Sequence, residues 1–74
     1  MIDEKELMKN DMAAKLAGLL IDKGLAKTMT EALDMVINSE TYEALRNEKS
    51  GLYYQSPLYV FDFLVNELIK GKMN

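Results

Sequence analysis

The segment Gly51-Leu-Tyr-Tyr-Gln-Ser-Pro-Leu-Tyr-Val-Phe-Asp-Phe-Leu64 holds five of the six aromatic residues of this 74-residue chain and its only proline. Serine followed by proline is a strong start signal for a helix, because the serine side chain caps a free amide and a proline at the first helical position has none to satisfy. We therefore predict a helix over 57–70, which Gly71 ends. The residues before it, 52–55, are predicted to form a short extended aromatic segment.

A first helix is predicted over 3–23, with Asp3 placed to cap its start and Gly24 to end it. Its core face is predicted to consist of Met8, Met12, Leu16, Leu19 and Leu20, with Ala13 and Ala17 at the edge. Further apolar residues lie beyond that face, at Leu7, Ala14 and Ile21. A helix so apolar around its circumference is either central in a bundle or half-covered by another subunit. Close contact with another helix is one reason for the glycine at position 18, which lowers helix stability.

Two shorter helices are predicted in the middle of the chain. Thr28-Met-Thr-Glu31 has the form of a capping box and starts a helix over 29–38. Its apolar stripe is predicted to be Met29, Ala32, Leu33, Val36 and Ile37, with Met35 pointing away. Ser39 is placed to cap a third helix over 39–47, anchored by Tyr42 and Leu45. Residues 1–74 are thus predicted to form a single all-α domain, a compact bundle of four helices.

The composition excludes several classes of site. The chain has no cysteine and no histidine, and therefore no disulfide, no usual zinc site and no histidine base. Carboxylates at helical spacing, such as those of Glu31 and Asp34 or of Glu40 and Glu43, are typical of solvated helix faces. We predict a non-catalytic protein with no metal and no cofactor. An enzyme that uses tyrosine and carboxylates in a pocket remains a third alternative.

The charge of the chain bears on its partners and its location. A formal net charge of −3 disfavours binding to nucleic acid and to an anionic membrane surface. Acidic residues at positions 3, 4 and 6 stand where a secretory signal would be basic, and no apolar run is long enough to span a bilayer. We therefore expect a cytoplasmic protein with no membrane segment.

The predicted last helix has an apolar side, formed by Leu58, Val60, Phe61, Leu64, Val65, Leu68 and Ile69. Asp62, Asn66, Glu67 and Lys70 cover the other side, and Tyr59 and Phe63 fall among those polar residues, four positions apart and hence adjacent on the helix surface. Either another part of the monomer covers the two rings, or they form an aromatic patch rimmed by charge, a composition typical of interface centres. The partner-binding residues are predicted to be Tyr53, Tyr54, Tyr59, Asp62, Phe63 and Asn66, with a protein partner or a second copy as the ligand.

DNA binding through the helix at 29–38 is the alternative function. Two helices joined by a glycine turn have the outline of a helix-turn-helix, whose second helix offers basic or amide side chains to DNA. Here that helix offers Glu31, Asp34 and Asn38 instead. The acidic side chains would repel phosphates, which places a protein partner ahead of DNA.

Three strings, Glu31-Ala-Leu-Asp-Met-Val, Asn38-Ser-Glu-Thr-Tyr-Glu and Gly51-Leu-Tyr-Tyr-Gln-Ser-Pro-Leu-Tyr-Val, together resemble a group of short, uncharacterised, all-helical bacterial proteins. The resemblance covers roughly the C-terminal two-thirds of the chain and carries no catalytic motif. Members of that group are sometimes encoded in cassettes that resemble toxin–antitoxin modules. The resemblance implies a bacterial protein with a partner-binding or regulatory role.

Overall fold

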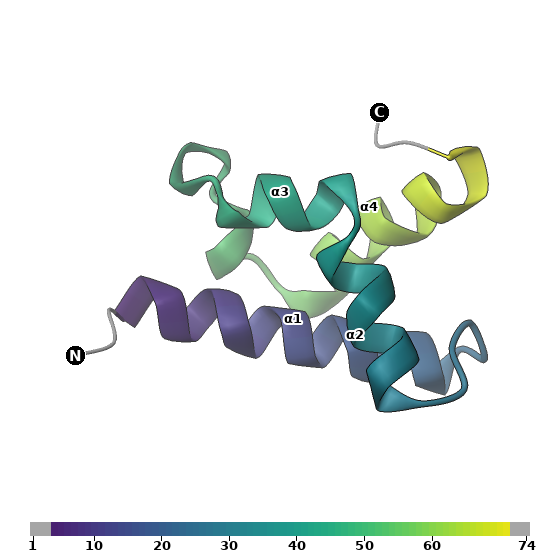
Figure 1. Cartoon of the computed structure of the whole chain (residues 1–74). Helices are drawn as coiled ribbons and strands as arrows, with labels where there is room; N and C mark the ends of the chain where they lie inside the picture. Colours follow the sequence, from purple (N-terminus) through teal and green to yellow (C-terminus); the bar gives the residue numbers. More distant parts are fainter. Residues whose placement is uncertain (1–3, 72–74) are drawn as a thin grey trace.

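The computed structural model describes residues 4–71, with the side chain of Lys5 excepted, and contains four α-helices (Figure 1). The helices are α1 (Glu4–Asp22), α2 (Met29–Ile37), α3 (Glu40–Arg46) and α4 (Pro57–Lys70). Two single turns of 3₁₀-helix, η1 (Glu48–Ser50) and η2 (Leu52–Tyr54), join α3 to α4. The described residues include no β-strand, and the predicted all-α bundle of four helices is confirmed. No helix in this part of the chain is both long enough and apolar enough to cross a membrane.

The long helix α1 is the element on which the others assemble. It packs most extensively against α2 and also contacts α3, α4 and η2, while α3 packs against α4 and η2. In Figure 1, α1 runs along the bottom of the view and α3 along the top, α2 lies in front of the far part of α1, and α4 lies to the right, rising to the height of α3. This arrangement buries one side of α1 and leaves its other side without a helix laid along it.

Side-chain caps define the starts of α2, α3 and α4, as predicted. The hydroxyls of Thr28, Ser39 and Ser56 accept hydrogen bonds from the amides three residues later, at 3.1, 3.0 and 3.2 Å. The carboxylate of Glu31 accepts from the Lys27 amide at 3.0 Å, one residue earlier than in a standard capping box. Gly24 and Gly71 follow α1 and α4 as predicted, while the predicted cap at Asp3 lies outside the described residues.

The prediction of an extended segment at 52–55 is wrong, because residues 52–54 form the turn η2. Gly51 adopts a left-handed conformation, with φ of 71°, that turns the chain between η1 and η2. The amide of Gln55 then donates to the carbonyl of Leu52 at 3.1 Å, and the Leu52 side chain enters the core. The turn therefore holds Tyr53 and Tyr54 close to α1 and α3.

The core lies between the buried side of α1 and the other helices. Its apolar members are Met12, Ala13, Leu16, Ala17, Leu20, Ala26, Ala32, Val36, Leu45, Leu52, Val60, Phe61 and Leu64. The predicted face of α1 is largely confirmed, except that Met8 is 37 % exposed and Leu19 is only half-buried. Both lie toward one flank of the core face, beside a groove described below.

The predicted faces of α2 and α4 need correction at their ends. Met29 and Ile37 are exposed, whereas Met35 is half-buried against the core, so the buried stripe of α2 is rotated toward Met35. Leu58 and Ile69, near the two ends of α4, are also exposed. A helix packs with its middle, and side chains at its ends extend past the element that would cover them.

Glu67 is the main departure from the predicted polar side of α4, because it is buried. Its carboxylate accepts hydrogen bonds from the amides of Glu40 and Thr41, at 2.8 and 2.9 Å, and from the Thr41 hydroxyl at 2.8 Å. Those amides belong to the first turn of α3, where no intrahelical acceptor is available. Glu67 thus joins the start of α3 to the end of α4.

Candidate partner-binding surface

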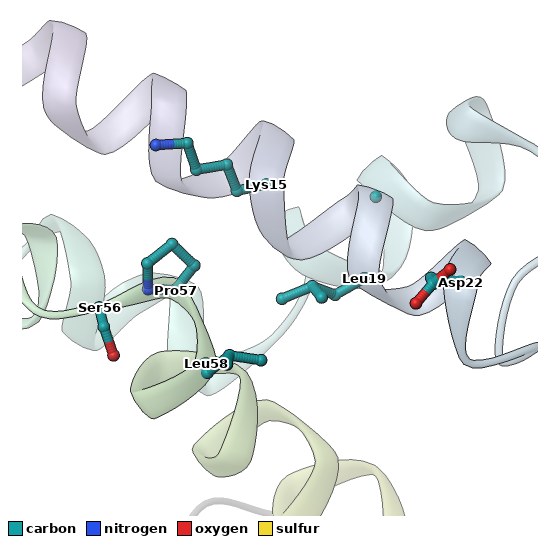
Figure 2. A pocket seen from close by; sticks show the side chains of 7 residues that line it. Lys15, Leu19, Asp22, Ser56, Pro57 and Leu58 are labelled. Carbon is teal, nitrogen blue, oxygen red and sulfur yellow. The ribbon is translucent and has the colours of Figure 1, made fainter.

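An open groove separates α1 from the start of α4 (Figure 2). Its volume is about 640 Å³, and its surface is mainly apolar. One wall is formed by α1 and the other by the first residues of α4, and the lining consists of Lys15, Gly18, Leu19, Asp22, Ser56, Pro57 and Leu58. Positions 15, 18, 19 and 22 repeat at spacings of three and four, which places them on one face of α1.

Gly18 is open to this groove, and no helix within the monomer makes a close contact with it. A methyl group added at position 18 would meet no atom within 4 Å. Pro57, the first residue of α4, stands across the groove from α1 and does not reach this position. Figure 2 shows Leu19 of α1 and Leu58 of α4 on opposite sides of the gap.

A second, smaller hollow of about 160 Å³ continues the groove toward the start of α1. It lies between α1 and η2 and is lined by Met8, Asp11, Met12, Lys15, Tyr53, Tyr54, Gln55 and Pro57. Lys15 and Pro57 line both hollows, so the two lie next to each other along α1. We refer to the two hollows together as the α1 groove.

Exposed apolar side chains stand along the α1 groove. Leu58 is 66 % exposed and Tyr54 is 61 % exposed, and Met8 adds a third partly exposed side chain. Large apolar side chains at this exposure lose contact with water when a partner covers them, which is the main favourable term in protein association. The groove therefore offers apolar surface flanked by a few charged residues.

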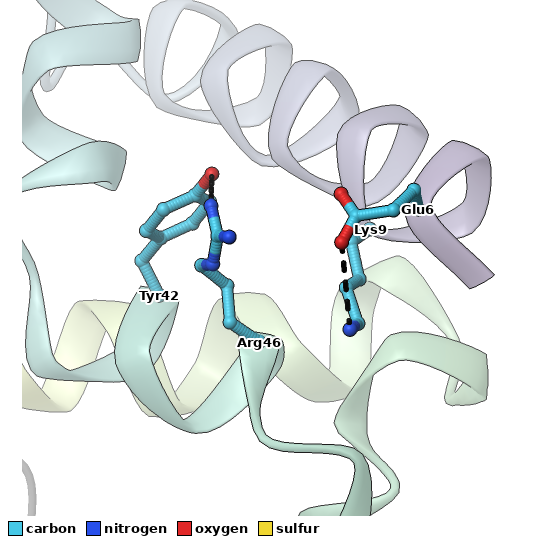
Figure 3. A network of polar contacts seen from close by, with 4 residues as sticks. All are labelled: Glu6, Lys9, Tyr42 and Arg46. Carbon is cyan, nitrogen blue, oxygen red and sulfur yellow. Dashed lines mark hydrogen bonds and ion pairs between the residues drawn. The ribbon is translucent and has the colours of Figure 1, made fainter. Parts of the chain in front are cut away.

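Lys9 fixes η2 beside the groove. Its side chain is only 10 % exposed and its ammonium lies 5.8 Å from the centre of the Tyr53 ring, within the range of a cation–π contact. The ammonium also forms an ion pair with the carboxylate of Glu6 at 4.0 Å (Figure 3). Tyr53 in turn meets Tyr54 edge to face, with ring centres 5.2 Å apart. Sequence reasoning missed Lys9, although it lies three residues before Met12 and seven before Leu16, in phase with the core face of α1.

A second polar contact lies on α3, also in Figure 3, where the Arg46 guanidinium donates to the Tyr42 hydroxyl at 3.4 Å. This hydrogen bond raises the pKa of Arg46 above its ordinary value. Arginine is charged at all ordinary pH values, so the shift has no functional consequence. The contact orients Tyr42 and supplies no reactive group.

The six residues predicted to bind a partner do not form one patch. Tyr53 and Tyr54 line the α1 groove, whereas Tyr59 and Phe63 form a separate edge-to-face pair on α4, with ring centres 5.3 Å apart. Tyr59 is 51 % exposed, but Phe63 is half-buried against the core. Asp62 and Asn66 are exposed on α4 and do not line either hollow. No ring contact between described residues links the two pairs.

Sequence reasoning missed most of the groove. Lys15 and Asp22 form part of a narrow charged strip on the helix wheel, which alone indicates only a solvated face. Leu58 lies on the apolar side of α4, and its exposure depends on how far α4 stands from α1. The one available signal was the excess of apolar residues around α1.

The described residues contain no group of three acidic side chains placed to hold a metal ion. No family model matches the chain, and no curated protein and no solved structure matches it. The resemblance to short bacterial cassette proteins therefore stays a prediction.

Proposed function

We propose that this protein is a small, non-catalytic interaction module that binds a protein segment in the α1 groove. The observation that carries the proposal is the open apolar groove with Leu58 and Tyr54 exposed at its edge. Grooves beside a helix are a recurrent docking site for another helix, which lays an apolar face into them. The resemblance to cassette proteins adds a bacterial setting and a regulatory role to the proposal.

The charges along the surface favour a protein partner over DNA. The groove carries one cation, Lys15, beside the acids Asp11 and Asp22. On α2, the helix considered for DNA, the side chains of Glu31 and Asp34 are exposed. Acidic side chains at these positions repel phosphates, whereas a mixed-charge rim around apolar surface suits a protein.

The exposed side of α4 provides a second contact area in the proposal. Tyr59 directly follows Leu58 in the chain and is half-exposed, and Asp62 and Asn66 lie further along the same helix. Tyrosine is enriched at interfaces because it combines a large apolar ring with a polar end. A partner that covers Leu58 and extends along α4 would contact these side chains.

Site-specific photo-crosslinking in the native host tests the proposal. A photoreactive phenylalanine analogue replaces Leu58 in one variant and Tyr54 in another, and replaces the exposed Asp34 of α2 in the control. We expect discrete protein adducts from positions 58 and 54 and none from position 34. Absence of adducts at both groove positions, or the same adducts at all three, would contradict the proposal.

A further inference from the structure

We infer that the larger hollow of the α1 groove, beside Gly18 and Leu19, receives a second copy of this chain, so that two α1 helices pack antiparallel across a two-fold axis near these two residues. The inference rests on the proposed function and names the partner of the same surface. In such a dimer each copy presents the same patch to the other, as a two-fold interface requires.

The charges of the groove are complementary under this symmetry. Lys15 lies three residues before Gly18, and Asp22 lies three residues after Leu19. Antiparallel packing centred between Gly18 and Leu19 therefore sets each Lys15 opposite the Asp22 of the other copy. Two ion pairs form, one on each side of the axis. Parallel packing would instead place like charges opposite each other.

The contacts that Lys15 and Asp22 make within the monomer are compatible with an ion pair between the two copies. Lys15 pairs with Asp11 of its own helix at 2.8 Å, and both side chains are more than half exposed. An exposed pair of this kind contributes little, and an ammonium has three donors, so Lys15 can contact a second carboxylate. Asp22 has no ion pair with any of the described residues.

The shape of α1 at the axis allows the approach. Gly18 has no side chain and faces open space, so the backbone of a second helix can come close at this point. A glycine within a helix lowers helix stability, and nothing within the monomer requires one at position 18. A close helix neighbour from another copy gives that position a physical reason.

The apolar residues around α1 also match a second copy. Leu7 is 53 % exposed and Ala14 is exposed, and both lie beyond the core face of α1, whereas Ile21 is half-buried against the core. The antiparallel packing brings the exposed Leu58 of each copy next to the α1 helix of the other copy.

Complementary charge reversals test the inference by light scattering and sedimentation over a wide concentration range. Lys15→Glu alone sets Glu opposite Asp22, and Asp22→Lys alone sets Lys opposite Lys15. We expect the dissociation constant of each variant alone to rise about tenfold or more, because two attractive pairs become repulsive. An equimolar mixture restores both pairs, and we expect a heterodimer about as stable as the wild-type dimer.

Two controls separate this result from damage to the fold. Lys49→Glu and Asp34→Lys make the same charge changes outside the groove, and we expect wild-type association from both.

Gly18→Leu tests the close approach of the two helices, because it fills the axis with a better helix former. We expect loss of the dimer with helicity retained by circular dichroism. A Lys15→Glu effect that reflected unfolding would not be rescued by mixing.

Three results would overturn the inference: a wild-type chain that is monomeric at all concentrations, single variants that still associate like the wild type, or a mixture that fails to associate. A monomeric wild type together with crosslinks from position 58 to a different protein would end the inference and leave the proposed function intact. A monomeric wild type with no crosslinks at all would contradict both.

Discussion

At the scale of single residues, Glu67 is the side chain whose role depends most on the tertiary structure. Its carboxylate receives three hydrogen bonds from the first turn of α3. We expect Glu67→Ala to lower the free energy of unfolding by about 2–3 kcal/mol, because buried donors lose a charged acceptor. Urea unfolding followed by circular dichroism measures the change.

Two further variants on α4 calibrate the loss from Glu67→Ala. Glu67→Gln keeps one acceptor oxygen, and we expect a smaller loss. Asp62→Ala removes an exposed carboxylate from the same helix, and we expect a change within about 0.5 kcal/mol. If Glu67→Ala were as mild as Asp62→Ala, the α3 amides would have found water and the capping contact would contribute little.

Gly18 and Gly51 give a matched pair of opposite predictions. Gly18→Ala adds a methyl group in open space within α1, and we expect a gain of about 0.5–1 kcal/mol in stability. Gly51→Ala places a side chain on a left-handed residue, 2.7 Å from the Tyr54 hydroxyl, and we expect a loss of about 1–2 kcal/mol. Thermal unfolding of both variants at one low concentration measures the two shifts, and shifts of the same sign would contradict the comparison.

Residue-level sequence reasoning works where the partner is near in the chain. The caps at Thr28, Ser39 and Ser56 bond amides three residues away, so the local sequence predicts them. Glu67 bonds amides 26 and 27 residues away. It lies seven residues after Val60 and three after Leu64, in phase with the buried side of α4, but its charge favours exposure. The local pattern gives the phase of this side chain and does not identify the distant amides that allow a carboxylate to be buried there.

At the scale of helices and turns, the two aromatic residues Tyr59 and Phe63 of α4 differ in burial. Phe63 is half-buried against the core and Tyr59 is half-exposed. We expect Phe63→Ala to cost about 1–3 kcal/mol of stability, less than a fully buried phenylalanine. Tyr59→Ala loses mainly the edge-to-face contact, about 0.5–1.5 kcal/mol. Urea unfolding of the two single variants measures the difference.

The difference in stability loss between Phe63→Ala and Tyr59→Ala determines which variant is suited to test association with a partner. Loss of binding in Tyr59→Ala with unfolding otherwise normal would place Tyr59 in the partner surface. The double variant Tyr59→Ala with Phe63→Ala is less informative, because loss of the Phe63 contacts lowers stability in either case. Equal stability losses from the two single variants would show that Tyr59 also belongs to the core.

The positions of the helices follow from sequence, but their exact packed faces do not. Apolar spacing and capping residues predict all four helices to within two residues at each end. The faces of α2 and α4 are correct in their middles and wrong at Met29, Ile37, Leu58 and Ile69, which lie at or near the helix ends and are exposed. At 52–54, aromatic residues favour an extended chain, and a left-handed Gly51 produces a 3₁₀ turn instead.

At the scale of the whole molecule, the groove lies where α1 and the start of α4 leave space between them. The start of α4 stands away from α1 and leaves Gly18 and Leu58 uncovered. The sequence indicates more apolar surface on α1 than one core face needs. Whether that excess is covered by the monomer or by a partner depends on helix crossing, which no local pattern encodes.

The charge distribution of the molecule supports a last prediction, on DNA. A net charge of −3 and the exposed Glu31 and Asp34 of α2 repel phosphates. We expect no mobility shift of duplex DNA at low salt, where phosphate contacts are strongest. The variant Glu31→Lys with Asp34→Lys changes the charge by four units and is expected to gain weak, salt-sensitive, non-specific binding. A shift by the wild-type chain that disappears as salt is raised would instead favour the DNA-binding alternative, because it would reveal phosphate contacts that this acidic surface is not expected to make.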